Sequence, residues 1–182
     1  MEMVTLAGLR RRLSRDEPPA GELRRASVAV IIDRHTPPKV LLIERARVTG
    51  DPWSGQVAFP GGKAQTGDLT LKDTAVREAM EEVGIDLAHD AEFLGYHQGL
   101  RTHNGLLDVF PAAFSLERDV KTRPNEEVAS FMWASLDVLA SASSRGTANV
   151  RDGGQAREVP ALRVGEYAVW GLTYRILSSL LG

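Results

Sequence analysis

The chain has 182 residues, enough for one domain with a substantial core, and its 22 Lys and Arg against 24 Asp and Glu give a formal net charge of −2. This balance provides no basic field that could hold nucleic acid. The absence of cysteine excludes disulfides, a thiolate nucleophile and a cysteine-based zinc site. The longest apolar runs are too short to cross a bilayer, and residues 1–19 lack the apolar core of a secretory signal. We therefore expect a soluble cytoplasmic protein with no membrane or nucleic-acid partner.

The hydrophobic pattern predicts helices and strands that alternate along the chain. Residues 4–14 have the pattern of a short amphipathic helix, followed by a polar, Pro-rich linker. The predicted strands are 27–33, 40–46, 56–59, 91–101, 106–116 and 126–134, followed by a hairpin over 149–162 that turns at Gly153-Gly154. The predicted helices are 71–84, where Gly84 suits the position just past the C-terminal end, 135–142 and a buried or half-buried tail, 167–181. This order predicts an α/β fold with a mixed sheet, in which residues 1–26 pack as a helix and linker on a single domain of residues 27–182.

The helix predicted at 71–84 carries its charged residues on one face. At about 100° per residue, alanine and valine side chains fall on one arc, and Arg77, Glu78, Glu81 and Glu82 fall on the opposite arc. Arg77 can pair with Glu81. Glu78 and Glu82 lie four residues apart with no basic partner, a repulsion that costs about 0.2–0.5 kcal/mol. Carboxylates one turn apart suit Mg²⁺ or Mn²⁺, although an acidic helix face is more commonly a solvated surface.

A pair of glycines, Gly61 and Gly62, precedes this helix within an expected loop over residues 60–68. Glycine permits unusual backbone angles and the close approach of the main chain to a ligand. A glycine loop beside a carboxylate cluster suggests metal-held phosphates, whereas the glycines by themselves also fit an ordinary turn.

Together these residues resemble the Nudix box, written G-x5-E-x7-R-E-U-x-E-E-x-G-U with U apolar. Gly62 matches the first glycine, and the run "REAMEEVGI" (77–85) matches the second half without exception. Asp68 stands where the box has Glu, and eight residues rather than seven separate it from Arg77.

The longer loop is similar to that of the coenzyme A pyrophosphatase branch of the Nudix family. The runs "GQVAFPGG" (55–62) and "VWGLTYRIL" (169–177) are also similar to that branch. The run "LLIERA" (41–46) departs from it, because Ile43 stands where the branch has Thr and the spacing from Arg45 to Gly55 is one residue longer.

The resemblance implies an α/β/α sandwich and a hydrolase that cleaves a nucleoside diphosphate linked to another group, with Mg²⁺ or Mn²⁺ as cofactor. It implies that Glu78 and Glu82 are the metal ligands and that Glu81, beside them, is a catalytic residue that binds the ion through water. A backbone carbonyl near Gly61 or Gly62 completes the implied site. The implied partner is a small nucleotide substrate, and a homodimer is left open.

Further candidates lie outside the box. The resemblance implies a general base from another loop, and "RPNEEVAS" offers Glu126 and Glu127, of which Glu127 is preferred because it directly precedes a strand; the alternative is a solvated acidic turn. Arg45 is a candidate for a substrate phosphate or a surface cation. Phe59 is a candidate for stacking on a base or for core packing. Arg77 is interpreted as structural rather than as a phosphate clamp.

The preferred interpretation is a hydrolase that splits coenzyme A or its thioesters into 3′,5′-ADP and phosphopantetheine. A Nudix hydrolase for another substrate, such as ADP-ribose or a nucleoside triphosphate, is the alternative within the family. A module that binds a nucleotide without cleaving it is an alternative of a different class. The presence of Glu78, Glu81 and Glu82 argues against that module, since binding alone needs no mutually repelling carboxylates.

Overall fold

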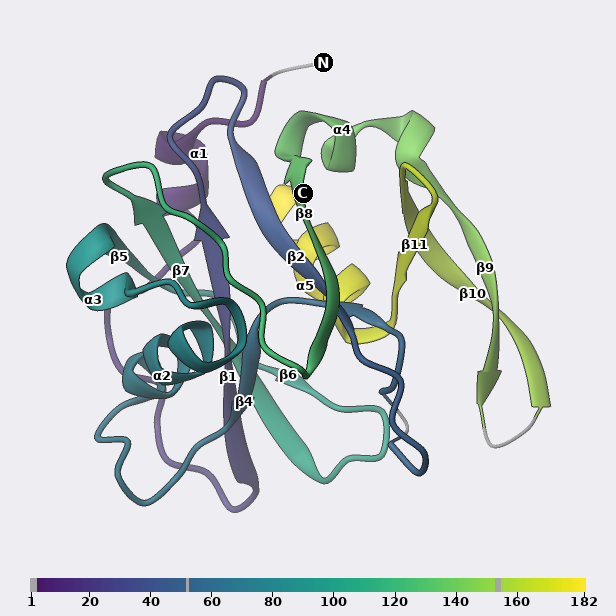
Figure 1. Cartoon of the computed structure of the whole chain (residues 1–182), viewed down its shortest axis with the longest axis horizontal. Coiled ribbons are helices and arrows are strands. Elements are labelled where there is room, and N and C mark those ends of the chain that lie inside the picture. Colours follow the sequence, from purple (N-terminus) through teal and green to yellow (C-terminus); the bar gives the residue numbers. More distant parts are fainter. Residues whose placement is uncertain (1–2, 52, 153–154) are drawn as a thin grey trace.

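The structure, a computed structural model of the whole chain, describes residues 3–51, 53–152 and 155–182 (Figure 1). In chain order its elements are α1 (Leu6–Arg10), β1 (Arg24–Ile32), β2 (Lys39–Arg45), β3 (Val57–Ala58), β4 (Gly61–Lys63), α2 (Leu71–Val83), α3 (Leu87–Asp90), β5 (Ala91–Tyr96), β6 (Leu100–Arg101), β7 (Leu107–Leu116), β8 (Val128–Ser135), α4 (Leu136–Ala140), the 3-10 turn η1 (Ala142–Ser144), β9 (Arg145–Asp152), β10 (Gln155–Val164), β11 (Tyr167–Trp170) and α5 (Gly171–Leu181).

The larger sheet is mixed. Its main order is β3-β2-β1-β7-β5, with β4 paired to β1, β6 to β7 and β8 to β2. Strand β1 runs parallel to β7 over its whole length, from Arg24↔Leu107 to Ile32↔Ser115, while β2 pairs antiparallel with both β3 and β8. The parallel pair lies at the centre of the sheet, and its strand β1 packs against α2.

Alternate residues of the central strands point to opposite faces of the sheet and create two cores. Val30 and Ile32 lie in one cluster with residues of α1, α4 and α5, whereas Ala29 and Ile31 lie in another cluster with residues of α2 and α3. Helices therefore cover both faces of the sheet (Figure 1). The predicted α/β/α sandwich with a mixed sheet is confirmed.

The N-terminal helix α1 is shorter than the predicted 4–14 and packs on the core through Leu9, which is buried. Strand β1 begins at Arg24 rather than at the predicted Ser27. The division of the chain at residue 27 stays a prediction.

The loop predicted over 60–68 contains a strand, and for this part of the chain the prediction is wrong. Strand β4 pairs antiparallel with β1 through Val28↔Gly61 and Ser27↔Gly62. A Cβ on Gly61 would lie 2.6 Å from the Ser27 carbonyl oxygen, so the strands approach this closely only with glycine. A glycine strand has no alternating side chains, which is why the sequence pattern gives no sign of it.

Two other predicted elements also differ from the structure. The tail predicted as a helix from 167 begins instead with β11, which pairs with β10, and the helix starts at Gly171. The strand predicted over 91–101 is divided into β5 and β6, and both pair with β7. Strand β7, the partner of β5 and β6, follows them in the chain, whereas β10 directly precedes β11 across residues 165–166; in both cases the pairing overrides the local pattern.

A smaller sheet has the order β11-β10-β9, and its β9–β10 hairpin extends away from the main body (Figure 1). The predicted turn of this hairpin, Gly153-Gly154, lies outside the described residues. None of the helices in the described part of the chain has both the length and the apolar composition needed to cross a bilayer.

Candidate active site

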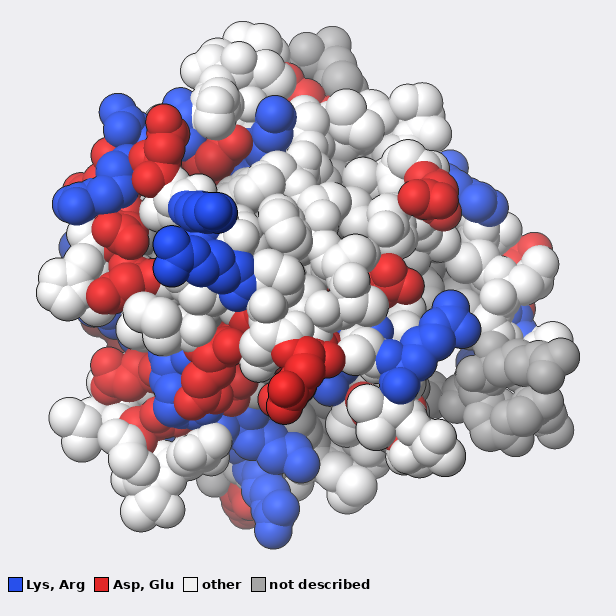
Figure 2. Space-filling view, viewed as in Figure 1, with Lys and Arg blue, Asp and Glu red and all other residues white. Residues whose placement is uncertain are grey.

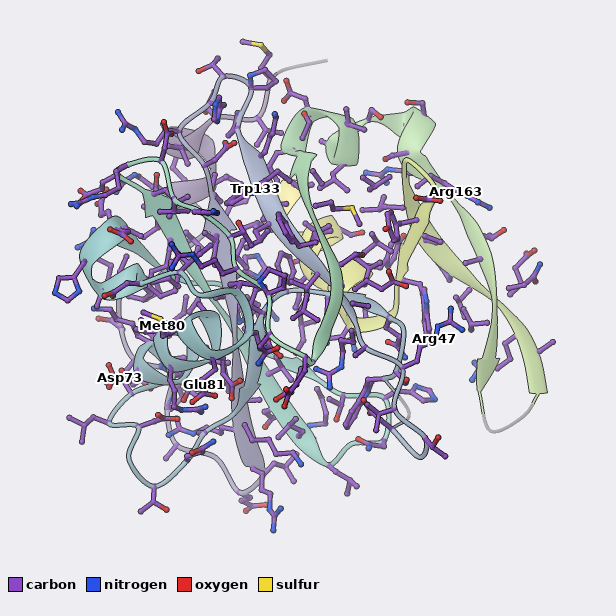
Figure 3. The ribbon with its side chains drawn as sticks, viewed as in Figure 1. Arg47, Asp73, Met80, Glu81, Trp133 and Arg163 are labelled. Atoms are coloured by element: carbon purple, nitrogen blue, oxygen red, sulfur yellow. The ribbon has the colours of Figure 1, made fainter. Side chains whose placement is uncertain are left out.

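Helix α2 carries the acidic face predicted from the sequence. Thr70 caps its start in a capping box, since its side chain accepts the Asp73 N–H and the Asp73 carboxylate accepts the Thr70 N–H. Gly84 ends the helix in the left-handed conformation with φ +65°, as predicted. Acidic and basic side chains lie intermixed over this helix in Figure 2, and Figure 3 labels Glu81 on it.

All three nitrogens of the Arg77 guanidinium donate hydrogen bonds to protein acceptors. Its Nε and Nη2 donate to the two oxygens of Asp68 at 3.1 and 3.0 Å. Its Nη1 donates to Glu78 Oε1 at 2.8 Å and to Glu81 Oε2 at 3.1 Å, and Nη2 also donates to the Lys63 carbonyl at 3.1 Å. A guanidinium with this set of partners favours the structural role over that of a phosphate clamp.

Asp68 is the acceptor at one end of this hydrogen-bond network around Arg77. Its hydrogen bonds with Arg77 lower the pKa of its carboxyl group to about 2, and it also accepts from Thr74 Oγ1 at 2.9 Å. Asp68 thus reaches Arg77 from the longer loop although it is shorter than the Glu of the usual box. Both departures from the box, Asp68 itself and the eight residues that separate it from Arg77, therefore lie in one continuous stretch of the chain.

Glu82 is the most deeply buried carboxylate of the face, with 3% of its side chain exposed. Its Oε2 accepts the Gly61 N–H at 2.9 Å, and its Oε1 lies 3.8 Å from Arg45 Nη1. Burial, together with the charges of Glu78 and Glu127, raises the pKa of Glu82 to about 7 against the opposing effects of the Gly61 N–H and Arg45. A buried carboxylate among other carboxylates is thus held by a backbone amide and one distant cation.

Glu78 packs directly against the second glycine. A Cβ on Gly62 would lie 2.2 Å from Glu78 Oε1, so any side chain there displaces the carboxylate. Neither Gly61 nor Gly62 has a positive φ. The glycines are therefore required for close approach and not for unusual backbone angles. Burial raises the pKa of Glu78, against the opposing effect of Arg77.

The other two predicted acidic residues are more exposed. Glu81 has 53% of its side chain exposed and pairs with Arg77. Glu127 is exposed, but its charge raises the pKa of both Glu78 and Glu82, so its carboxylate lies within electrostatic reach of them. Its backbone is fixed, because the Glu127 N–H donates to Asn125 Oδ1 at 2.9 Å and its carbonyl accepts the Ala46 N–H at 2.8 Å.

Arg45 and Phe59 occupy different environments. Arg45 Nη2 lies 3.3 Å from Asp51 Oδ2, and its buried Nε has no hydrogen-bond partner within residues 3–51, 53–152 and 155–182. The ring of Phe59 is 3% exposed and lies within the core cluster, a position that favours core packing over stacking on a base. The pairing of Arg45 with Asp51 and the binding of Glu82 by the Gly61 amide were missed, since neither has a local sequence pattern.

The donor set fits a hard divalent cation. Glu78 and Glu82 provide carboxylate oxygens one helical turn apart, and a cation between them would offset the repulsion and burial that raise their pKa values. Among the described residues, no three His, Cys, Asp or Glu side chains are already gathered around a common point. Glu78 Oε1 accepts from Arg77 and Glu82 Oε2 accepts the Gly61 N–H, so each carboxylate is oriented by one protein donor.

Comparison with known proteins identifies the family to which this chain belongs. A family model described as the NUDIX domain matches residues 22–152, more than half of the chain. The chain belongs to the Nudix hydrolase family. The Nudix hydrolase NudL of Pectobacterium atrosepticum is 32% identical over 163 residues, covering 89% of this chain and 83% of that protein. The NudL of Photorhabdus laumondii is 34% identical over 145 residues, covering 79% of this chain and 76% of that protein. As a Nudix hydrolase, the chain is an enzyme that acts on a phosphoanhydride bond.

Solved Nudix structures share the fold. The MutT/nudix family protein of Enterococcus faecalis superposes with a TM-score of 0.55 at 18% identity, covering 91% of this chain and 63% of that one. The Nudix hydrolase RenU of M. smegmatis gives a TM-score of 0.51 at 22% identity, covering 64% of this chain and 73% of that one. At these identities the likeness concerns the fold alone.

Proposed function

We propose that this Nudix hydrolase cleaves the pyrophosphate of coenzyme A or acyl-coenzyme A into 3′,5′-ADP and phosphopantetheine or its acylated form. The observation that carries the hydrolytic part is the buried Glu82, held by the Gly61 amide beside Glu78. Support for the substrate is the resemblance of "GQVAFPGG" (55–62) and "VWGLTYRIL" (169–177) to the coenzyme A branch.

Glu78 and Glu82 hold Mg²⁺ or Mn²⁺ in this proposal. Glu81 contributes through a water molecule, and a carbonyl near Gly61 or Gly62 adds a neutral oxygen. When bound, the divalent ion neutralises phosphate charge and lowers the pKa of a bound water. The hydrogen bonds between Asp68 and Arg77 hold the loop that contains Asp68 against α2, and this fixes the directions of the carboxylates on α2.

Glu127 takes the proton from the attacking water. The water oxygen bonds to one phosphorus of the pyrophosphate, the bridging P–O bond breaks, and the released phosphate oxygen becomes part of the second product. Support for this role is the fixed backbone of Glu127 and the effect of its charge on Glu78 and Glu82. An exposed carboxylate exchanges its proton readily with solvent, as a base that acts in every turnover requires.

Arg45 binds a phosphate oxygen of the substrate. Its guanidinium lies between Asp51 and Glu82, and 27% of the Arg45 side chain is exposed. A phosphate approaching the exposed part of this guanidinium gains a charge-assisted hydrogen bond. Phe59, by contrast, acts through the core rather than by contact with the substrate.

Product analysis by chromatography tests the proposal. The protein is incubated with Mg²⁺ or Mn²⁺ and, in separate reactions, coenzyme A, ADP-ribose, a dinucleotide and a nucleoside triphosphate. Glu82→Gln is the inactive variant, and Glu92→Gln, at an exposed carboxylate on β5, is the matched control. We expect 3′,5′-ADP from coenzyme A with the wild type and with Glu92→Gln but not with Glu82→Gln. Preferential cleavage of ADP-ribose would reject the substrate while retaining the chemistry.

A further inference from the structure

The first turn of α2 is only partly capped by its own sequence. Thr70 accepts the Asp73 N–H through Oγ1 at 3.1 Å and the Thr74 N–H through its carbonyl at 3.2 Å. The two preceding amides, those of Leu71 and Lys72, point out of the helix and need acceptors from elsewhere.

Two distant residues provide these acceptors. The Leu71 N–H donates to Glu17 Oε1 at 2.9 Å, and the Lys72 N–H donates to Tyr96 Oη at 2.9 Å. Glu17 lies in the segment between α1 and β1, and Tyr96 is the last residue of β5. The carboxylate of Glu17 is also well placed to interact with the positive end of the helix dipole.

The two acceptors, Glu17 and Tyr96, are also hydrogen-bonded to each other. Tyr96 Oη donates its hydrogen to Glu17 Oε2, so the hydroxyl group both accepts from Lys72 and donates to Glu17. The Tyr96 ring is buried, and its edge contacts Phe93 with ring centroids 5.1 Å apart. A hydroxyl group bonded in this way has a single orientation.

The segment that carries Glu17 is itself fixed to β5. The Ser14 N–H donates to the Tyr96 carbonyl at 2.9 Å, and the Tyr96 N–H donates to the Ser14 carbonyl at 2.6 Å. A Cβ on Gly95 would lie 2.6 Å from the Ser14 carbonyl oxygen, so the contact depends on glycine. Leu9 anchors the preceding helix in the core. Hydrogen bonds through Glu17 and Tyr96 therefore connect the first turn of α2 to strand β5 of the sheet.

We propose that Glu17 and Tyr96 are positioning residues that set the direction of α2 and thereby the position of its carboxylates. This inference rests on the proposed function for the role of those carboxylates. Glu82 lies eleven residues beyond Leu71, about 16 Å along the helix axis. Over that length a tilt of about 4° displaces its carboxylate by about 1 Å, an error that can lower a reaction rate by about 100-fold.

Substitutions at both positions test the proposal. Glu17→Ala removes the acceptor for Leu71, and Tyr96→Phe removes the hydroxyl group but keeps the ring. Glu92→Ala is the matched control, because it releases Arg10 and Arg15 of the same N-terminal segment without touching α2. Each variant is assayed for turnover of coenzyme A, for Mn²⁺ affinity by calorimetry and for thermal unfolding.

We expect Glu17→Ala and Tyr96→Phe to lower kcat about tenfold with little change in KM, and to weaken Mn²⁺ binding about fivefold. Glu17→Gln recovers only part of both values, because its amide oxygen still accepts the Leu71 N–H while its NH2 group cannot accept the Tyr96 hydroxyl hydrogen. Glu92→Ala keeps the wild-type kcat and Mn²⁺ affinity.

The proposal is overturned if Glu17→Ala and Tyr96→Phe match the wild type, or if Glu92→Ala shows the same losses. If Glu17→Ala does not fold, Tyr96→Phe decides. A wild type that cleaves no substrate but binds Mn²⁺ more tightly than Glu17→Ala would reject the proposed function and support the positioning role. A wild type that neither cleaves nor binds Mn²⁺ would reject both.

Discussion

Replacing Glu82 with glutamine should make the metal-free protein more stable at alkaline pH. The substitution keeps the shape of the side chain and an oxygen that accepts the Gly61 N–H, but removes the buried charge. The charged groups that face this position are Glu78, Glu127 and Arg45. Two of the three are carboxylates, so ionised Glu82 is destabilised both by burial and by its neighbours.

The magnitude follows from the shift in pKa. The pKa of Glu82 is raised from 4.5 to about 7, so between these values the folded state keeps a proton that the unfolded state has released. The contribution of Glu82 to the free energy of unfolding therefore falls as pH rises through this window. At about 1.4 kcal/mol per pKa unit, ionising Glu82 costs about 3 kcal/mol.

Urea unfolding in EDTA, repeated from about pH 5 to about pH 8, measures this effect. The stability advantage of Glu82→Gln over the wild type should grow to about 3 kcal/mol at the alkaline end. Glu81→Gln, on the same helix but half exposed, is the control and should show little change. Added Mn²⁺ at the alkaline end should stabilise the wild type and not Glu82→Gln. A difference that stays constant with pH would refute the reasoning.

Three further predictions concern the glycines, Arg77 and the helix cap. Gly62→Ala places a Cβ 2.2 Å from Glu78 Oε1, so we expect kcat to fall about 100-fold with an almost unchanged melting temperature. Gly61→Ala places a Cβ against the Ser27 backbone and should instead destabilise the fold by about 1–3 kcal/mol. Thermal unfolding of the two variants separates these effects. Arg77→Lys loses the paired hydrogen bonds to Asp68 and should cost about 2 kcal/mol in urea unfolding; a wild-type midpoint would contradict the structural role. Thr70→Ala removes the helix cap and should lower the free energy of unfolding by about 1 kcal/mol and the melting temperature by about 2–4 °C. Thr70→Ser keeps the capping oxygen and should retain the wild-type melting temperature. Equal losses of stability in both variants would exclude the capping explanation.

Helix α2 could be predicted from sequence because its determinants are local. The spacing of its apolar residues and the glycine at its end lie within or next to the helix, and the structure confirms both. Strand β11 was predicted as part of the last helix because its residues lead directly into α5; its pairing with β10 across the turn at Gly165 makes Tyr167–Trp170 a strand. Strand β4 was missed for a related reason, since its glycines are selected by the approach of β1.

The same distinction applies to the candidate site. The mutually repelling pair Glu78 and Glu82 is visible as a charge pattern on one helix face. The acceptor role of Glu82 toward the Gly61 amide depends on how β4 pairs with β1, and the contact of Arg45 with Asp51 depends on a loop. Such contacts join segments whose sequences have no fixed spacing, so they become visible only in the folded chain.

The most direct test of the central claim is the rate of coenzyme A cleavage as a function of Mn²⁺ or Mg²⁺, followed by the release of 3′,5′-ADP. The wild type should be inactive in EDTA and regain activity when the ion is restored, whereas Glu78→Gln and Glu82→Gln should stay at least about 100-fold less active at saturating ion. Full activity of the wild type in EDTA, or of Glu82→Gln with the ion, would contradict the assignment of α2 as the metal-binding helix.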